Sequence, residues 1–157
     1  MEYRKILVAI DRMSHNTEVL EDALDLAQKQ GSRMMFLYCL EQETVAREED
    51  RIATVAELVE ADSLRAFEGR QQTEVEHARA WLETLTGLAE ERGIVALAEA
   101  EVGEPGQRIC DLASRWGADL IILGQSGRGL LTEFILGSVT RHVVHHASCS
   151  VLLVKRK

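Results

Sequence analysis

Four glycines and a serine between positions 124 and 138 have the types and the spacing to bind an anion. Gly127 and Gly129 can adopt positive φ and let backbone N–H groups approach an anion without a Cβ in the way. Ser138, which follows Gly137, is of a type favoured at the amino end of a helix, where free N–H groups and the helix dipole attract negative charge. We therefore expect the loop and the helix start to converge on one phosphate site.

The stretch before these glycines predicts where the site lies in the fold. Residues 119–123 form a nearly continuous apolar run, typical of a strand buried on both faces of a parallel sheet. Gly124 then comes at the carboxyl end of that strand, and ligands of open α/β sheets bind beyond such ends. Taken singly, each glycine could merely end a strand or make a turn. It is their joint spacing that favours a binding site.

The spacing differs from the commonest phosphate and nucleophile motifs. No lysine follows a glycine, as the Walker A loop requires, and Thr132 stands where the last glycine of the dinucleotide fingerprint would be. Ser126 is not in a hydrolase nucleophile elbow, because Arg128 stands where the second glycine of G-x-S-x-G would be. The pattern Gly124-x2-Gly127-x9-Gly137-Ser138 instead resembles the ATP-binding signature of the universal stress protein family, in its nucleotide-binding branch.

The resemblance extends over the whole chain. It includes the segments KILVAID, MFLYCL, VGEPGQRI and SVLLVK, which come in that order around the signature. It implies an ATP-binding protein of the stress response, with ATP or a related adenine nucleotide as ligand and Mg²⁺ or Mn²⁺ on its phosphates. It also implies an open, Rossmann-like parallel sheet of five strands in the order 3-2-1-4-5.

The resemblance further assigns residues around the base and the phosphates. Asp11 with Ala9 beside it would lie near adenine and ribose, and the backbone of Cys39 would touch the base. Arg128 would add positive charge at the phosphates, and Val139 belongs to the helix start that follows the signature. Asp11 could equally do no more than cap the turn after the first strand, because aspartate is common in turns.

Composition favours one intracellular domain over residues 1–157. The chain has 157 residues, 46% of them hydrophobic, which is enough for one well-buried core. We expect a cytoplasmic protein without a membrane span or signal peptide, because no long apolar stretch occurs. The three cysteines are an odd number without metal-type pairing and fit a reducing compartment. The net charge of −8 argues against a nucleic-acid partner.

Hydrophobic periodicity predicts alternating strands and helices, with helices on both faces of a parallel sheet. The region 41–93 fits this pattern least well. Helical spacing before and after Gly69 predicts two helices there, the first within an inserted acidic segment, 41–67, and the second in the core fold. Elsewhere we expect strands at 5–10, 33–40, 94–102, 119–123 and 150–154, and helices at 17–30, after Pro105, and at 138–146.

Two histidines have the spacing of metal ligands. His142 and His146 lie four residues apart on one predicted helix. No carboxylate or cysteine at a matching offset completes a set, so cationic or core-packed histidines are the preferred interpretation.

Three functions remain open. The first is a nucleotide-binding regulatory protein, which the signature favours. The second is a slow ATPase or phosphotransfer enzyme, although Asp119 and Glu133 are the only carboxylates near the signature. The third is a nucleotide-free interaction module of the same fold. In each case we expect a homodimer through the edge strand 150–154, whose apolar SVLLV sequence would otherwise be left unpaired.

Overall fold

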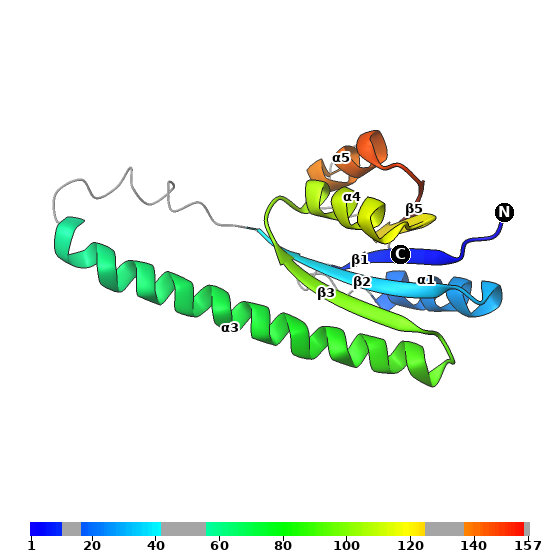
Figure 1. Cartoon of the computed structure of the whole chain (residues 1–157), viewed down its shortest axis with the longest axis horizontal. Coiled ribbons are helices and arrows are strands. Elements are labelled where there is room, and N and C mark those ends of the chain that lie inside the picture. Colours follow the sequence, from blue (N-terminus) through cyan, green and yellow to red (C-terminus); the bar gives the residue numbers. More distant parts are fainter. Residues whose placement is uncertain (11–16, 42–55, 125–136, 156–157) are drawn as a thin grey trace.

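The computed structural model describes residues 1–10, 17–41, 56–124 and 137–155, and the side chains of 56–67 and of Gln71 are not described. Nine helices and strands occur in these ranges, in an order that alternates strands with helices (Figure 1). They are β1 (Lys5–Ile10), α1 (Thr17–Gln30), β2 (Arg33–Leu40), α3 (Ala56–Glu91), β3 (Ala96–Val102), α4 (Pro105–Trp116), β4 (Leu120–Gly124), α5 (Ser138–His146) and β5 (Ser150–Val154).

The five strands form one parallel sheet in the order β3-β2-β1-β4-β5. This confirms the predicted fold class and strand order. Strands β1 and β4 lie side by side although they are far apart in sequence, with Ala9 opposite Leu123. Because the strand order reverses at β1, a crevice is expected beyond the carboxyl ends of β1 and β4.

Helices cover both faces of the sheet, as the alternating connections require. One buried cluster joins α1 and α3 to one face of the sheet, and a second cluster joins α4 and α5 to the other face. On the first face, the guanidinium of Arg92 pairs with Glu21 at 2.6 Å and with Asp25 at 2.9 Å, which links the end of α3 to α1. Helices α4 and α5 cover the second face.

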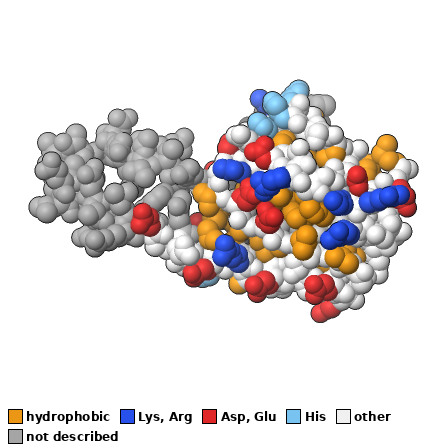
Figure 2. Space-filling view, in the orientation of Figure 1, with side chains coloured by type: hydrophobic (Ala, Val, Ile, Leu, Met, Phe, Trp, Pro, Cys, Tyr) orange, Lys and Arg blue, Asp and Glu red, His pale blue; other side chains and the backbone are white. Residues whose placement is uncertain are grey.

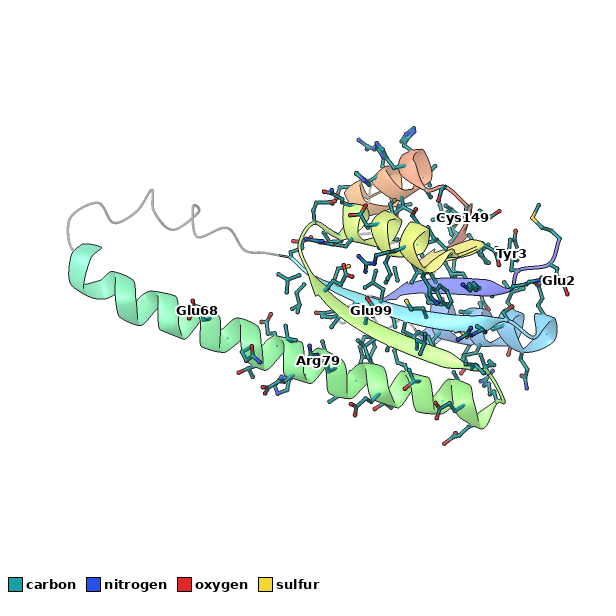
Figure 3. The ribbon with its side chains drawn as sticks, viewed as in Figure 1. Glu2, Tyr3, Glu68, Arg79, Glu99 and Cys149 are labelled. Atoms are coloured by element: carbon teal, nitrogen blue, oxygen red, sulfur yellow. The ribbon has the colours of Figure 1, made fainter. Side chains whose placement is uncertain are left out.

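Helix α3 is a single helix of 36 residues, so the prediction of two helices separated at Gly69 is wrong. A glycine inside a helix costs only about 0.5–1 kcal/mol relative to alanine, and helical residues on both sides outweigh that cost. Among the side chains of α3 that are described, the buried ones begin at Ala78 and continue through Leu82, Leu85 and Ala89. The preceding part projects beyond the sheet (Figure 1), and Glu68, labelled in Figure 3, extends from it into solvent.

Helix α4 is bounded by two clear signals. The carboxylate of Glu104 accepts hydrogen bonds from the backbone N–H groups of Gly106 and Gln107, and Pro105 begins the helix. Gly117 ends it with φ of 72°, a left-handed conformation that glycine adopts without strain. Within the described residues, no helix is both long enough and apolar enough to cross a bilayer.

Candidate functional site

The predicted site residues divide into two groups. Asp11, Gly127, Arg128 and Gly129 lie outside the described residues, so their assignments stay predictions. The other six lie within the described residues, at the ends of strands or at the start of α5. They are Ala9, Cys39, Gly124, Gly137, Ser138 and Val139.

Parallel pairing brings the strand residues of this group to the same end of the sheet. Ala9 of β1 lies opposite Leu37 of β2 and opposite Leu123 of β4. Gly124 follows Leu123 along β4. Cys39 lies two residues beyond Leu37 in the same direction. Ala9 and Cys39 are therefore together at the carboxyl ends of the three central strands.

The start of α5 lies on the same face of the sheet. Val139 packs, together with Ala9 and Cys39, against the buried cluster that α4 and α5 cover. Because Val139 belongs to the first turn of α5, that turn packs on the same face of the sheet as Ala9 and Cys39. The fold thus brings sequence positions 9, 39 and 139 together around one cluster.

Among the described residues, no side chain caps the first turn of α5. Gly137 occupies the N-cap position with φ −58° and ψ 160°, and its carbonyl accepts the N–H of Arg141 at 2.9 Å. Ser138 is the first helical residue and is exposed, so Gly137 rather than the serine takes the N-cap position. Since Gly137 has no side chain to cap the helix, the first N–H groups keep their capacity to bind an anion.

Helix α5 is held in place by close packing against α4. Val143 and Thr140 are buried beneath it. His142 lies directly on Gly106 of α4, where an added Cβ would be 2.7 Å from the Cβ of His142. Sequence reasoning missed this contact, although the glycine in the second position of α4 was a possible signal of a close helix approach.

The thiol of Cys39 is not a candidate nucleophile. Burial raises the pKa of this thiol to about 12, with a further rise from the nearby Glu101 carboxylate. A thiol with such a pKa is protonated at neutral pH, and the thiolate is the reactive form. Cys39 therefore acts as a small neutral packing group at the end of β2.

Asp119 lies at the amino end of the strands, opposite to the candidate site at their carboxyl ends. Its carboxylate accepts hydrogen bonds from the backbone N–H groups of Arg4 and Lys5, both at 2.9 Å, where β1 begins. Asp119 precedes β4 and is thus at the amino end of the sheet. One of the two carboxylates near the signature therefore ties two strands together, and the other, Glu133, lies outside the described residues.

Comparisons with known proteins agree on one family. The profile of the universal stress protein family matches residues 2–155. The chain is 39% identical to Universal stress protein Sll1388 of Synechocystis sp., with 99% of each chain covered.

Solved structures with a similar fold support the same family assignment. The chain resembles the structure of hypothetical protein MJ0577, from Methanocaldococcus jannaschii, with a TM-score of 0.75 and 26% identity over 100% of this chain and 99% of that one. It also resembles the universal stress protein from Archaeoglobus fulgidus in complex with dAMP, with a TM-score of 0.58 and 24% identity over 98% of each chain. The chain therefore belongs to the universal stress protein family.

Proposed function

We propose that this protein binds ATP or a related adenine nucleotide and acts in the stress response as a regulatory protein. The observation that carries the proposal is the first turn of α5, which no described side chain caps and which lies on the same face of the sheet as Ala9 and Cys39. That turn offers backbone N–H groups to phosphate, and a crevice at a strand-order reversal is the usual ligand position of this fold class. The dAMP bound to the Archaeoglobus fulgidus relative is an adenine nucleotide of the same kind.

Each predicted residue has a role in this proposal. The base and ribose contact Ala9, Asp11 and the backbone of Cys39. The phosphates bind the backbone of the glycine loop and the start of α5, with Arg128 adding charge. The glycine loop comprises Gly124, Gly127 and Gly129, and the helix start comprises Gly137, Ser138 and Val139.

A divalent ion, Mg²⁺ or Mn²⁺, fits this site through the nucleotide rather than through a protein cage. In the described ranges, no group of three histidine, cysteine, aspartate or glutamate side chains gathers as a metal site. Phosphate oxygens are good ligands for both ions. The ion would neutralise phosphate charge, while the protein positions the phosphates.

The assembly we propose is a cytoplasmic homodimer joined through β5. This strand is one edge of the sheet, and its sequence SVLLV contains no charged residue or proline. Leu152 is 39% exposed there. Two copies can pair their β5 strands about a two-fold axis and so remove both open edges.

Calorimetric titration with ATP and Mg²⁺ tests the nucleotide site. Gly137→Val should abolish detectable binding, because the new side chain would enter the space that phosphate needs beside the helix start. The backbone of Gly137 has φ −58°, which valine adopts without strain, so the variant should remain folded. Gly87→Ala is the control, since a Cβ at Gly87 meets nothing within 4 Å.

The alternatives differ in how the parent protein binds ATP and how fast it turns ATP over. A nucleotide-free interaction module would bind no ATP even as the parent protein. A phosphotransfer enzyme would turn ATP over at about 1–100 s⁻¹, as kinases do. We expect binding with far slower turnover, because the carboxylate of Asp119 is engaged at the other end of the sheet.

A further inference from the structure

Two arginines of α4 lie beside β3, and they differ in whether a carboxylate neutralises them. Arg108 and Arg115 are seven residues apart and so share a face of the helix. Arg115 pairs with Glu99 at 3.6 Å and with Glu101 at 2.8 Å. Arg108 forms no ion pair with any side chain that the structure describes. Figure 2 shows basic and acidic side chains next to one another where Figure 1 places α4 and β3.

The guanidinium of Arg108 lies against the chain just beyond β3. A Cβ added at Gly103 would be 2.6 Å from Nε of Arg108 and 3.3 Å from its Cζ, so the glycine leaves the space that the guanidinium occupies. The N–H of Gly103 donates to the carbonyl oxygen of Leu40 at 2.9 Å, and Leu40 ends β2 directly after Cys39. Arg108 is therefore at the carboxyl ends of β2 and β3, close to the backbone that we propose contacts the base.

Arg108 is also on the correct face of the sheet for such a contact. Cys39 and Ala9 pack against the cluster that α4 and α5 cover, and Arg108 belongs to α4. Burial and then Glu101 raise the pKa of the Cys39 thiol, whereas the positive charge of Arg108 lowers it, which agrees with a guanidinium near this thiol. The side chain of Arg108 is exposed, so a ligand beyond the strand ends can contact it.

The position of Arg108 favours the base over the phosphates as its partner. The proposed phosphate contacts are at the end of β4 and at the start of α5, whereas Arg108 lies at the end of β3. Strand β3 is three positions from β4 in the sheet, and neighbouring strands are about 4.8 Å apart, which gives a separation of about 14 Å. A nucleotide that binds its phosphates at β4 therefore has its base on the side of Arg108.

We propose that the guanidinium of Arg108 stacks on the purine base of the bound nucleotide. The inference rests on the proposed nucleotide site and adds a side chain that distinguishes bases. Guanidinium groups are planar and stack on aromatic rings, and the ring face attracts their charge. A larger ring system offers more surface to the guanidinium, so Arg108 favours purine over pyrimidine nucleotides.

Calorimetric titration of the full-length protein with ATP, and displacement of ATP by CTP, test the inference. Arg108→Met should weaken ATP binding roughly 2- to 30-fold, the range expected for a cation–π contact. CTP should lose less, so the ratio of ATP to CTP affinity should fall. Arg108→Lys should also bind ATP more weakly than the parent, because an ammonium group keeps the charge but has no plane to stack.

Arg33→Met is the matched control, because Arg33 is exposed at the amino end of β2 and its loss removes the same charge. This variant should bind both nucleotides like the parent. Parental ATP affinity in Arg108→Met would overturn the inference while leaving the nucleotide site intact. Equal losses of ATP and CTP, with parental binding in Arg108→Lys, would assign the contact to phosphate and overturn the stacking. A parent protein that binds no ATP would instead overturn the proposed function, and this inference with it.

Discussion

The two edges of the sheet, β3 and β5, differ in charge more than in apolar exposure. Leu97 on β3 is 42% exposed and Leu152 on β5 is 39% exposed. Strand β3, however, carries Glu99 and Glu101, and Arg115 of α4 contacts both carboxylates, at 3.6 and 2.8 Å. Glu99 is labelled on this strand in Figure 3. In β5 the sequence SVLLV has no charge at all.

Charged side chains on an edge strand oppose pairing with another strand, because pairing would bury them. The carboxylate of Glu101 is already partly desolvated, and its Oε2 atom is buried with no hydrogen-bond partner among the described residues. A further strand beside β3 would bury this group more deeply. Charge therefore protects the β3 edge against association, whereas β5 carries no charge that would oppose pairing.

Charging the β5 edge gives the largest expected effect. In the proposed dimer, Leu152→Glu would place two like charges across the two-fold axis and weaken dimerisation by several kcal/mol. That corresponds to an increase of about 100-fold or more in the dimer dissociation constant. Light scattering at micromolar concentration measures the change. Leu97→Glu is the matched control on β3 and should leave the mass unchanged, and a monomeric parent protein would contradict the proposed dimer.

Removing the charge from the β3 edge should produce the opposite change. Glu99→Ala combined with Glu101→Ala gives β3 an apolar edge like that of β5, so species larger than the parent assembly should form as concentration rises. Sedimentation velocity measures their fraction. Glu90→Ala combined with Glu91→Ala removes the same charge from exposed positions on α3. If both double variants associate equally, net charge rather than the edge is responsible.

The thiols beside the two edges should differ in reactivity. The pKa of Cys39, which lies opposite Glu101 of β3, is raised to about 12 from an ordinary 9.0. At pH 8 its thiolate fraction is thus about 1,000-fold below that of an ordinary thiol. Site-resolved alkylation by mass spectrometry should find Cys39 slower than Cys149, which precedes β5. Glu101→Gln should speed Cys39 modestly, because burial is the larger cause of the shift.

The same pKa predicts a direction for stability. Above about pH 9 the unfolded chain loses the Cys39 proton, whereas the folded chain keeps it until about pH 12. The free energy of unfolding should therefore fall as pH rises through this window. Cys39→Ser should show a weaker fall in denaturant titrations. An equal fall in both proteins would show that other groups govern the alkaline range.

The smallest expected effect concerns α3, which packs beside the β3 edge. A Cβ at Gly87 meets no atom within 4 Å, so Gly87→Ala should raise the free energy of unfolding by about 0.5–1 kcal/mol. Urea unfolding followed by circular dichroism measures this gain. The assembly should not change, because Gly87 lies on neither edge. A loss of stability would mean that the helix packs more tightly at this position.

Much of the fold could be predicted because local signals and global fold agree. The sequence pattern marked all five strands, although the predicted strand 94–102 began two residues before β3 and the predicted strand 119–123 lay one residue before β4. The strand order came from the family resemblance. Gly69 misled the prediction because a single glycine weakens a helix without ending it.

Residues of the candidate site were harder to predict in detail. The joint spacing from Gly124 to Ser138 indicated a phosphate site, but a favoured N-cap residue type did not decide which residue caps α5. Gly137 is the N-cap because Ser138 is already the first residue of the helix. The roles of Glu101 and Arg115 depend on contacts between separate elements, which no local pattern contains.

The length of α3 affects how the assembly should be measured. A helix of 36 residues is about 54 Å long, whereas a compact domain of 157 residues, with a radius of gyration of about 15 Å, is roughly 40 Å across. Because α3 extends beyond the sheet, frictional drag should exceed that of a sphere of the same mass. Gel-filtration elution would then overestimate the mass, and a monomer would elute in the direction of a dimer. Methods that weigh the particle directly are needed to tell the two apart.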